Sequence, residues 1–137
     1  MRLPTEAEWE YAYRAGTTTA FHGYAGNLSG TNDDSLVENI GWYFAISHDT
    51  RPVGGKLANG YGLHDMSGNV WEWVSDWFGG YSANFQTDPT GPASGSARVV
   101  RGGSWYDAPS NLRASARYGT PDYAIYDYIG FRVARNP

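Results

Sequence analysis

Residues 59–73 read NGYGLHDMSGNVWEW, and the second half of this stretch carries the clearest strand pattern in the chain. Between Gly68 and Val74, two valines and two tryptophans stand close together, a composition typical of a β-strand. The residues before it are rich in Gly, Asn and Ser, which favour turns. We therefore expect a strand at 68–74 that follows a long irregular segment.

Two more strands are expected on the C-terminal side of this stretch. Residues 98–105 read RVVRGGSW and residues 129–135 read IGFRVAR, and we expect these two strands to pair antiparallel. Between them, residues 106–128 are interrupted by Pro109, Gly119 and Pro121, with a short helix expected at 111–116. A surface segment held at both ends by strands is where binding residues are often found.

On the N-terminal side the sequence predicts one helix. Thr5 can serve as its N-cap, Glu8 completes a Thr-x-x-Glu capping box, and Gly16 ends it. The face expected to pack on the core comprises Trp9, Ala12 and Tyr13, and the face expected in water comprises Glu6, Glu10 and Arg14. Residues 16–62 read as long loops with one short helix near 35–39.

The composition of the chain excludes several classes of function. The 137 residues, 41% of them hydrophobic, suit one soluble domain covering 1–137, and no apolar run is long enough for a membrane span. A net charge of −4 argues against nucleic acid as a partner. The lack of cysteine excludes disulfides, thiolate metal ligands and a thiol nucleophile. With no secretory leader in the first residues, we expect a cytoplasmic location.

Several blocks resemble the formylglycine-generating-enzyme family, whose members modify sulfatases. They are RLPTEAEWEYA at 2–12, PVG at 52–54, NGYGLHDMSGNVWEW at 59–73, RGGSW at 101–105 and GFR at 130–132. Their order matches that of the family over nearly the whole chain. The resemblance implies an α+β structure of the C-type-lectin type: a small antiparallel sheet, one or two helices and long irregular loops.

The chain departs from that family at the catalytic residues. The paired active-site cysteines of the enzymes correspond here to Asp107 and roughly Leu112, so no thiolate is present to hold Cu(I). We therefore expect no catalytic residue and no required cofactor. The resemblance also implies a calcium site formed by Asn69, the Val70 carbonyl and Glu72, with oxygen ligands that suit this cation. The alternative is that Glu72 pairs with Arg101 or Arg132 to join buried strands.

The segment at 106–128 resembles the variable region of diversity-generating-retroelement proteins, which share the lectin fold. In those proteins the template adenines, often in AAC codons, are replaced during copying, which cannot produce Lys, Glu, Gln, Met or Trp. The positions that fit are Tyr106, Asp107, Ala108, Ser110, Asn111, Tyr118, Gly119, Thr120, Tyr123, Ala124, Ile125, Tyr126, Asp127 and Tyr128. Such Tyr, Asp, Ser and Gly clusters are typical of binding surfaces. Loop aromatics that pack on the scaffold are the alternative.

Two functions remain open on the sequence. The first is a binding protein whose diversified surface recognises an unknown target, expected to be a protein, with an oligomeric state that the sequence does not define. The second is an enzyme or enzyme fragment of the same fold, such as a sulfoxide-synthase-like or other oxidoreductase. The first predicts exposed tyrosines on one face, above a core that includes Trp71 and Phe131.

Overall fold

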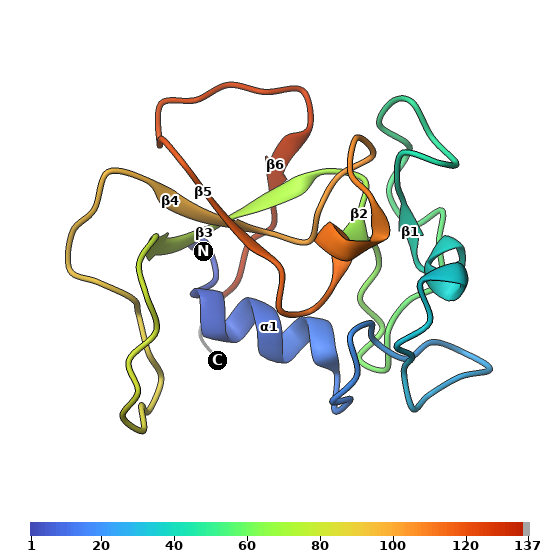
Figure 1. Cartoon of the computed structure of the whole chain (residues 1–137), viewed down its shortest axis with the longest axis horizontal. Coiled ribbons are helices and arrows are strands. Elements are labelled where there is room, and N and C mark those ends of the chain that lie inside the picture. Colours follow the sequence, from blue (N-terminus) through green and yellow to red (C-terminus); the bar gives the residue numbers. More distant parts are fainter. Residues whose placement is uncertain (136–137) are drawn as a thin grey trace.

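The computed structural model describes residues 1–135 and has the expected α+β class, with little regular structure and long connections (Figure 1). In chain order the elements are α1 (Glu6–Arg14), η1 (Asp34–Asn39), β1 (Gly41–Trp42), β2 (Ser67–Gly68), β3 (Trp71–Trp77), β4 (Arg98–Arg101), η2 (Pro109–Leu112), β5 (Arg117–Thr120) and β6 (Ile129–Phe131). Here η marks a 3₁₀ helix. α1 lies beneath the sheet, and the loop after β5 lies above it.

The main sheet has the strand order β5-β4-β3-β6. β4 pairs antiparallel with both β3 and β5, whereas β6 pairs parallel with β3. The expected direct pairing of the strands at 98–105 and 129–135 is therefore wrong, because β3 lies between them. The small sheet expected to be antiparallel is mixed, because β6 runs parallel to β3. β1 and β2 form a separate parallel pair. β3 occupies the centre because its aromatic and aliphatic residues can be covered on both sides.

Two expected strands are shorter than their composition suggested. The stretch at 68–74 is divided because Gly68 and Asn69 have φ values of 72° and 67°, outside the range of a strand. β4 ends at Arg101 because Gly102 and Gly103 have φ values of 97° and 72°. Left-handed backbone of this kind favours glycine, so the Gly-Gly pair marks the end of the strand.

α1 begins as its sequence predicts. The Thr5 hydroxyl accepts the Glu8 backbone N–H at 3.2 Å, and the Glu8 carboxylate accepts the Thr5 N–H at 2.8 Å. Trp9 and Tyr13 are buried in the core, as expected. Glu6 is also buried, which corrects the expectation that it faces water, because it meets two arginines of the sheet.

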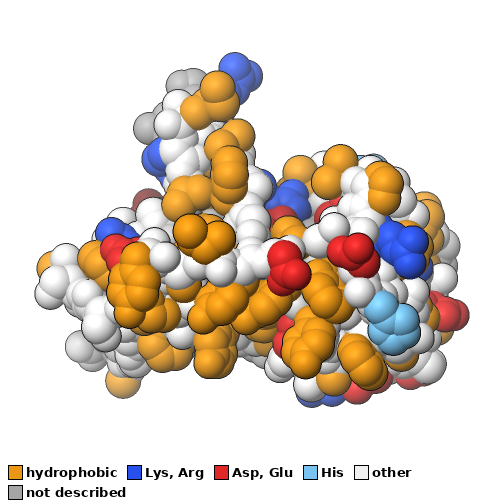
Figure 2. Space-filling view, turned by 90° about the horizontal axis from the view of Figure 1, so that it is seen from above, with side chains coloured by type: hydrophobic (Ala, Val, Ile, Leu, Met, Phe, Trp, Pro, Cys, Tyr) orange, Lys and Arg blue, Asp and Glu red, His pale blue; other side chains and the backbone are white. Residues whose placement is uncertain are grey.

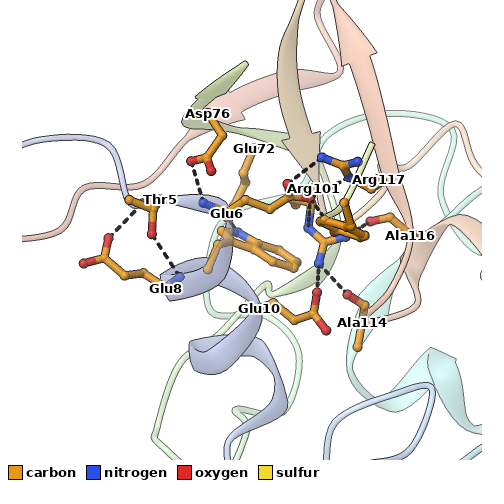
Figure 3. Close-up of polar contacts among 12 residues, drawn as sticks. Thr5, Glu6, Glu8, Glu10, Glu72, Asp76, Arg101, Ala114, Ala116 and Arg117 are labelled. Carbon is orange, nitrogen blue, oxygen red and sulfur yellow. Dashed lines mark hydrogen bonds and ion pairs between the residues drawn. The ribbon is translucent and has the colours of Figure 1, made fainter. Parts of the chain in front are cut away.

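A network of charges joins α1 to the sheet (Figure 3). The fully buried Arg101 guanidinium pairs with Glu10, lies 3.5 Å from Glu6, and donates to the Ala114 carbonyl at 2.7 Å. Arg117 pairs with both oxygens of Glu6 at 2.8 and 2.6 Å. The arginines therefore form the buried ion pairs and carbonyl hydrogen bonds that their aromatic surroundings favour.

The hydrophobic core consists of two clusters. One joins α1 to β3 and β4, and the other lies under the loops of residues 20–43. The first contains Trp9, Tyr13, Met66, Val74, Val99 and Ala114, and the second contains Phe21, Val37, Ile40 and Leu112. Trp71 is buried as expected, but Phe131 is 68% exposed, which corrects its assignment to the core. Among residues 1–135, no helix has the length and apolar character needed to cross a bilayer.

Candidate functional site

The sheet presents different side chains on its two faces. Alternation along β3, β4 and β5 directs Glu72 and Arg117 towards α1, and directs Trp71, Val100 and Tyr118 to the opposite face. On that opposite face lies a hollow of about 460 Å³. This volume falls within the roughly 300–1,000 Å³ typical of ligand sites.

Residues 106–128 wrap around this hollow. The segment begins after β4, forms η2, contributes β5 to the sheet edge and returns through a loop to β6. It is therefore part of the sheet as well as a surface excursion, and the helix expected at 111–116 is the 3₁₀ turn at Pro109–Leu112 instead. β5 holds Tyr118 opposite Val100 of β4, so a rigid strand positions one wall of the hollow.

The aromatic rings of the segment contact one another in a row. Tyr126 and Tyr128 stack with ring centroids 5.0 Å apart and an interplanar angle of 11°. Tyr128 stacks on Tyr106 at 6.3 Å, and Phe44 meets the edge of Tyr106 at the same distance. Such pairs contribute about 0.5–1.5 kcal/mol beyond burial. The row therefore holds several large rings in fixed positions at the surface.

Asp107 fixes the base of the segment. One carboxylate oxygen accepts hydrogen bonds from the Trp71 indole N–H at 2.8 Å and from the Ser104 backbone N–H and hydroxyl at 3.0 and 2.5 Å. The other oxygen accepts from the Asn111 amide at 2.7 Å. Asp107 therefore orients the tryptophan at the bottom of the hollow and closes the turn that leads into η2.

The structure brings many of the sequence-predicted residues together. Those that line the hollow are Tyr106, Asp107, Asn111, Tyr118, Gly119, Thr120, Tyr126 and Tyr128, and those placed outside its lining are Ala108, Ser110, Tyr123, Ala124, Ile125 and Asp127. Most of the set is exposed or half-buried, and Tyr118, Tyr123 and Ile125 are 63%, 82% and 94% exposed. Thr120 differs because it is buried, so its side chain offers no contact surface.

Aromatic residues from outside the predicted segment also contribute to this face. Trp71 lines the hollow and contacts the Tyr118 ring at 6.3 Å, and Phe44 extends the aromatic row. Trp71 was expected only in the core. Neighbours in a strand face opposite sides, so the pairing of Glu72 with an arginine of the core could have indicated that Trp71 faces the other way. No sequence pattern pointed to Phe44, which belongs to a loop about 60 residues earlier in the sequence than the segment.

Two of the expected calcium ligands, Asn69 and Glu72, make contacts within the protein. Both Glu72 oxygens are 2.6 Å from Arg132 nitrogens, and one also accepts the Trp9 indole N–H at 2.7 Å. The Asn69 amide exchanges two hydrogen bonds with the Arg51 backbone, at 2.9 and 3.1 Å. Glu72 is therefore paired with a guanidinium, as the alternative with Arg132 predicted. Within residues 1–135, no three His, Asp or Glu side chains gather as metal ligands.

The histidines serve local contacts in the structure. His22 is buried, and its Nδ1–H donates to the Gly23 carbonyl at 2.8 Å. Burial lowers the pKa of His22, so the neutral ring is favoured. His64 bonds the Lys56 carbonyl through Nδ1 at 2.8 Å, and His48 lies against the Phe44 ring. None of these contacts pairs a histidine with a nucleophile or with a carboxylate that would activate it.

Comparison with known proteins places this arrangement in a family. The model of the sulfatase-modifying factor enzyme 1-like domain matches residues 1–137. The chain belongs to the family of sulfatase-modifying factor enzyme 1-like domains. The domain is 41% identical to the formylglycine-generating enzyme of Streptomyces coelicolor over 150 residues, which cover 98% of the chain and 46% of that enzyme. It is also 41% identical to the serine/threonine-protein kinase pkn1 of Chlamydia caviae over 138 residues, or 98% of the chain and 21% of the kinase.

A solved structure agrees with the lectin-like fold. The domain superimposes on Treponema denticola variable protein 1 with a TM-score of 0.85 and 39% identity, covering 95% of this chain and 45% of that one. The expected resemblance to variable proteins is thereby confirmed. The domain spans less than half the length of each of these three relatives. Asp107 and Leu112, which the resemblance led us to expect at the positions of the enzymes' cysteines, are respectively hydrogen-bonded to Trp71 and buried.

Proposed function

We propose that this domain is a binding module and that residues 106–128 form its ligand-binding face. The observation that carries the proposal is the convergence of the tyrosine-rich segment on one hollow, opposite the face that α1 covers. A framework of buried ion pairs lies beneath, so the face can differ in sequence while the fold remains. The fold similarity to a variable protein supports a diversified surface.

Crosslinking tests the binding face. A photoreactive phenylalanine analogue is placed at Tyr118 or Tyr126, and the matched control carries it at Tyr11, which is 69% exposed on α1. With cell extract from the source organism and from its neighbours, the two face positions are expected to give the same specific adduct and the control none. Adducts that form equally at Tyr11, or at Tyr11 alone, contradict the proposed face.

DNA sequencing tests the diversification. A diversified segment requires a near-identical repeat near the gene, with adenines at the first two positions of the codons for Tyr118, Tyr123, Tyr126 and Tyr128, and a reverse-transcriptase gene beside it. A neighbourhood without such a repeat contradicts the retroelement part of the proposal. The crosslinking result would still stand as a measure of binding.

An enzymatic function is the second candidate, and the identity to formylglycine-generating enzymes favours it. In that chemistry a thiolate holds copper, and the sequence of this chain has no cysteine. We therefore expect no aldehyde when the domain is incubated with copper and a cysteine-containing sulfatase peptide. Aldehyde detected by hydrazide labelling would support the enzyme instead.

We also propose that calcium is not needed for the fold, because Arg132 neutralises Glu72. EDTA is expected to leave the melting temperature unchanged. A melting temperature that falls in EDTA and recovers with added calcium would restore the site at Asn69, Val70 and Glu72.

A further inference from the structure

The hollow on the proposed binding face is lined by rings from four parts of the chain. Trp71 lies at its base, Tyr106 follows β4, Tyr118 projects from β5, and Tyr126 and Tyr128 come from the loop before β6. These rings contact one another in pairs. The Trp71 and Tyr118 rings are tilted by 44°, and the Tyr126 and Tyr128 rings are nearly parallel. Aromatic faces carry partial negative charge, so several of them around one space attract a cation.

The hollow also contains an uncompensated carboxylate. Asp107 accepts its hydrogen bonds from Trp71, Ser104 and Asn111, all of which are neutral. In the described part of the chain, no lysine or arginine forms an ion pair with Asp107. Arg117 contributes to the lining, but its guanidinium is bound to Glu6 and the Gly79 carbonyl. No cation therefore balances the charge of Asp107, and its Oδ1, which accepts one hydrogen bond from Asn111, is the oxygen with room for a ligand donor.

The surroundings of the hollow have the same sign. Asp122 and Asp127 are exposed on the loop that forms its rim. The pKa of Tyr128 is raised, first by burial and then by neighbouring groups that include Tyr126, Asp107 and Asp127. Viewed from the side of this loop, hydrophobic side chains gather on the face with acidic side chains among them (Figure 2). Charge complementarity therefore calls for a positively charged ligand group.

We propose that the hollow binds an arginine side chain presented by a protein partner. This inference rests on the proposed binding function and specifies the chemistry of its target. The planar guanidinium can stack on the tyrosine faces while its N–H groups reach the carboxylate of Asp107. A guanidinium is also more weakly hydrated than an ammonium, so arginine loses less than lysine on entering an aromatic site. Arginine is also frequent among the residues that contribute most to the binding free energy of protein interfaces.

Titration with small probes tests the site without knowledge of the partner. The intact domain, with its tryptophan indole nitrogens labelled with ¹⁵N, is titrated with Nα-acetyl-arginine N-methylamide and with the citrulline analogue, which has nearly the same shape and no charge. The arginine probe is expected to shift the Trp71 indole N–H signal saturably, with an affinity about tenfold or more above that of citrulline. The lysine analogue is expected to bind more weakly than arginine.

Variants connect the signal to the hollow. Tyr126→Leu removes one ring of the stack and is expected to weaken arginine binding severalfold. Asp107→Asn removes the charge and is expected to weaken it further, and the Trp71 indole signal reports whether the base of the hollow is intact. Tyr11→Leu, a matched exposed tyrosine on α1, is expected to leave the titration unchanged.

The outcomes separate the two proposals. Equal binding of arginine and citrulline, no shift with either probe, tighter binding of lysine than of arginine, or titrations unaffected by Tyr126→Leu and Asp107→Asn would each overturn the arginine site. If crosslinking still maps a partner to Tyr118 and Tyr126, the binding function stands and the arginine inference alone fails. If the arginine probe binds but a partner crosslinks at Tyr11, the hollow stands as an arginine site and the proposed function fails.

Discussion

Arg117 and Tyr118 are neighbours in β5, and their side chains lie on opposite faces of the sheet. Arg117 forms two hydrogen bonds with Glu6 of α1 and one with the Gly79 carbonyl at 2.6 Å. Tyr118 is 63% exposed beside the hollow, where its ring contacts Trp71. One short strand thus supplies a fixed residue to the framework and a replaceable residue to the binding face. Within β5, strand alternation therefore separates the two roles.

The largest effect is expected where the framework is charged and buried. Arg101→Met removes a fully buried guanidinium that pairs with Glu10, lies near Glu6 and donates to the Ala114 carbonyl, and it is expected to cost about 3–5 kcal/mol of unfolding free energy. Arg113→Met is the matched control, since its pair with Asp34 is exposed and such pairs contribute about 0.2–1 kcal/mol. Urea unfolding measures both. Equal losses would mean that burial does not distinguish the two arginines.

Two aromatic residues on neighbouring strands sharpen the comparison. Trp71 is buried, so Trp71→Ala is expected to cost about 3–5 kcal/mol. Phe131 is 68% exposed although β3 pairs its strand, so Phe131→Ala is expected to change stability by less than about 0.5 kcal/mol. Thermal unfolding compares the two. A Phe131 variant as unstable as the Trp71 variant would place Phe131 in the core after all.

The free energy of unfolding is expected to depend on pH through the buried His22. Because burial lowers its pKa in the folded state, the unfolded chain binds the proton more readily. Stability linked to His22 is therefore full above the ordinary pKa of about 6.5 and falls as the pH decreases below it, by at most about 1.4 kcal/mol per pH unit. His22→Phe should reduce this slope, and the exposed His48→Gln should not. Equal slopes in wild type and His22→Phe would contradict the assignment.

The smallest effects are expected on the binding face. Tyr118→Ala, Tyr123→Ala and Asp127→Ala should each change the unfolding free energy by less than about 0.5 kcal/mol, as is usual for surface sites. Tyr126→Ala should cost slightly more because it breaks the stack with Tyr128. Thermal unfolding of the four variants provides the measurement. Losses comparable to that of Trp71→Ala would show that the tyrosines support the fold.

Local chemistry made part of this fold predictable. The Thr5–Glu8 capping box depends on residues close in sequence, so the start of α1 could be inferred. The left-handed turn at Gly102 and Gly103 is equally local, but the expected strand at 98–105 ran through it. The burial of Glu6 could not, because its partner Arg117 is 111 residues away. The position of β6 beside β3 was equally hidden, since hydrophobic composition does not specify which strands pair. The exposure of Phe131 follows from that order.

The candidate site was predictable in composition and less so in shape. The clustering of tyrosines after β4 indicated a binding segment, and many of them line one hollow. Thr120 shares the face of Tyr118, two residues before it in β5, but it is buried, and composition alone does not indicate this difference. The role of Asp107 in orienting Trp71 depends on a hydrogen bond between residues 36 positions apart, and no spacing rule predicts such a contact.

The central claim is that one face can vary while the framework cannot, and two displayed libraries test it most directly. In the first, Tyr118, Tyr123, Tyr126 and Asp127 are replaced together by NNK codons; in the second, Glu6, Trp9, Arg101 and Arg117 are replaced in the same way. Protease resistance of the displayed domain reports the folded fraction of each library. We predict that most members of the first library resist protease like wild type and that most members of the second do not. Equal loss of resistance in both libraries would contradict the account.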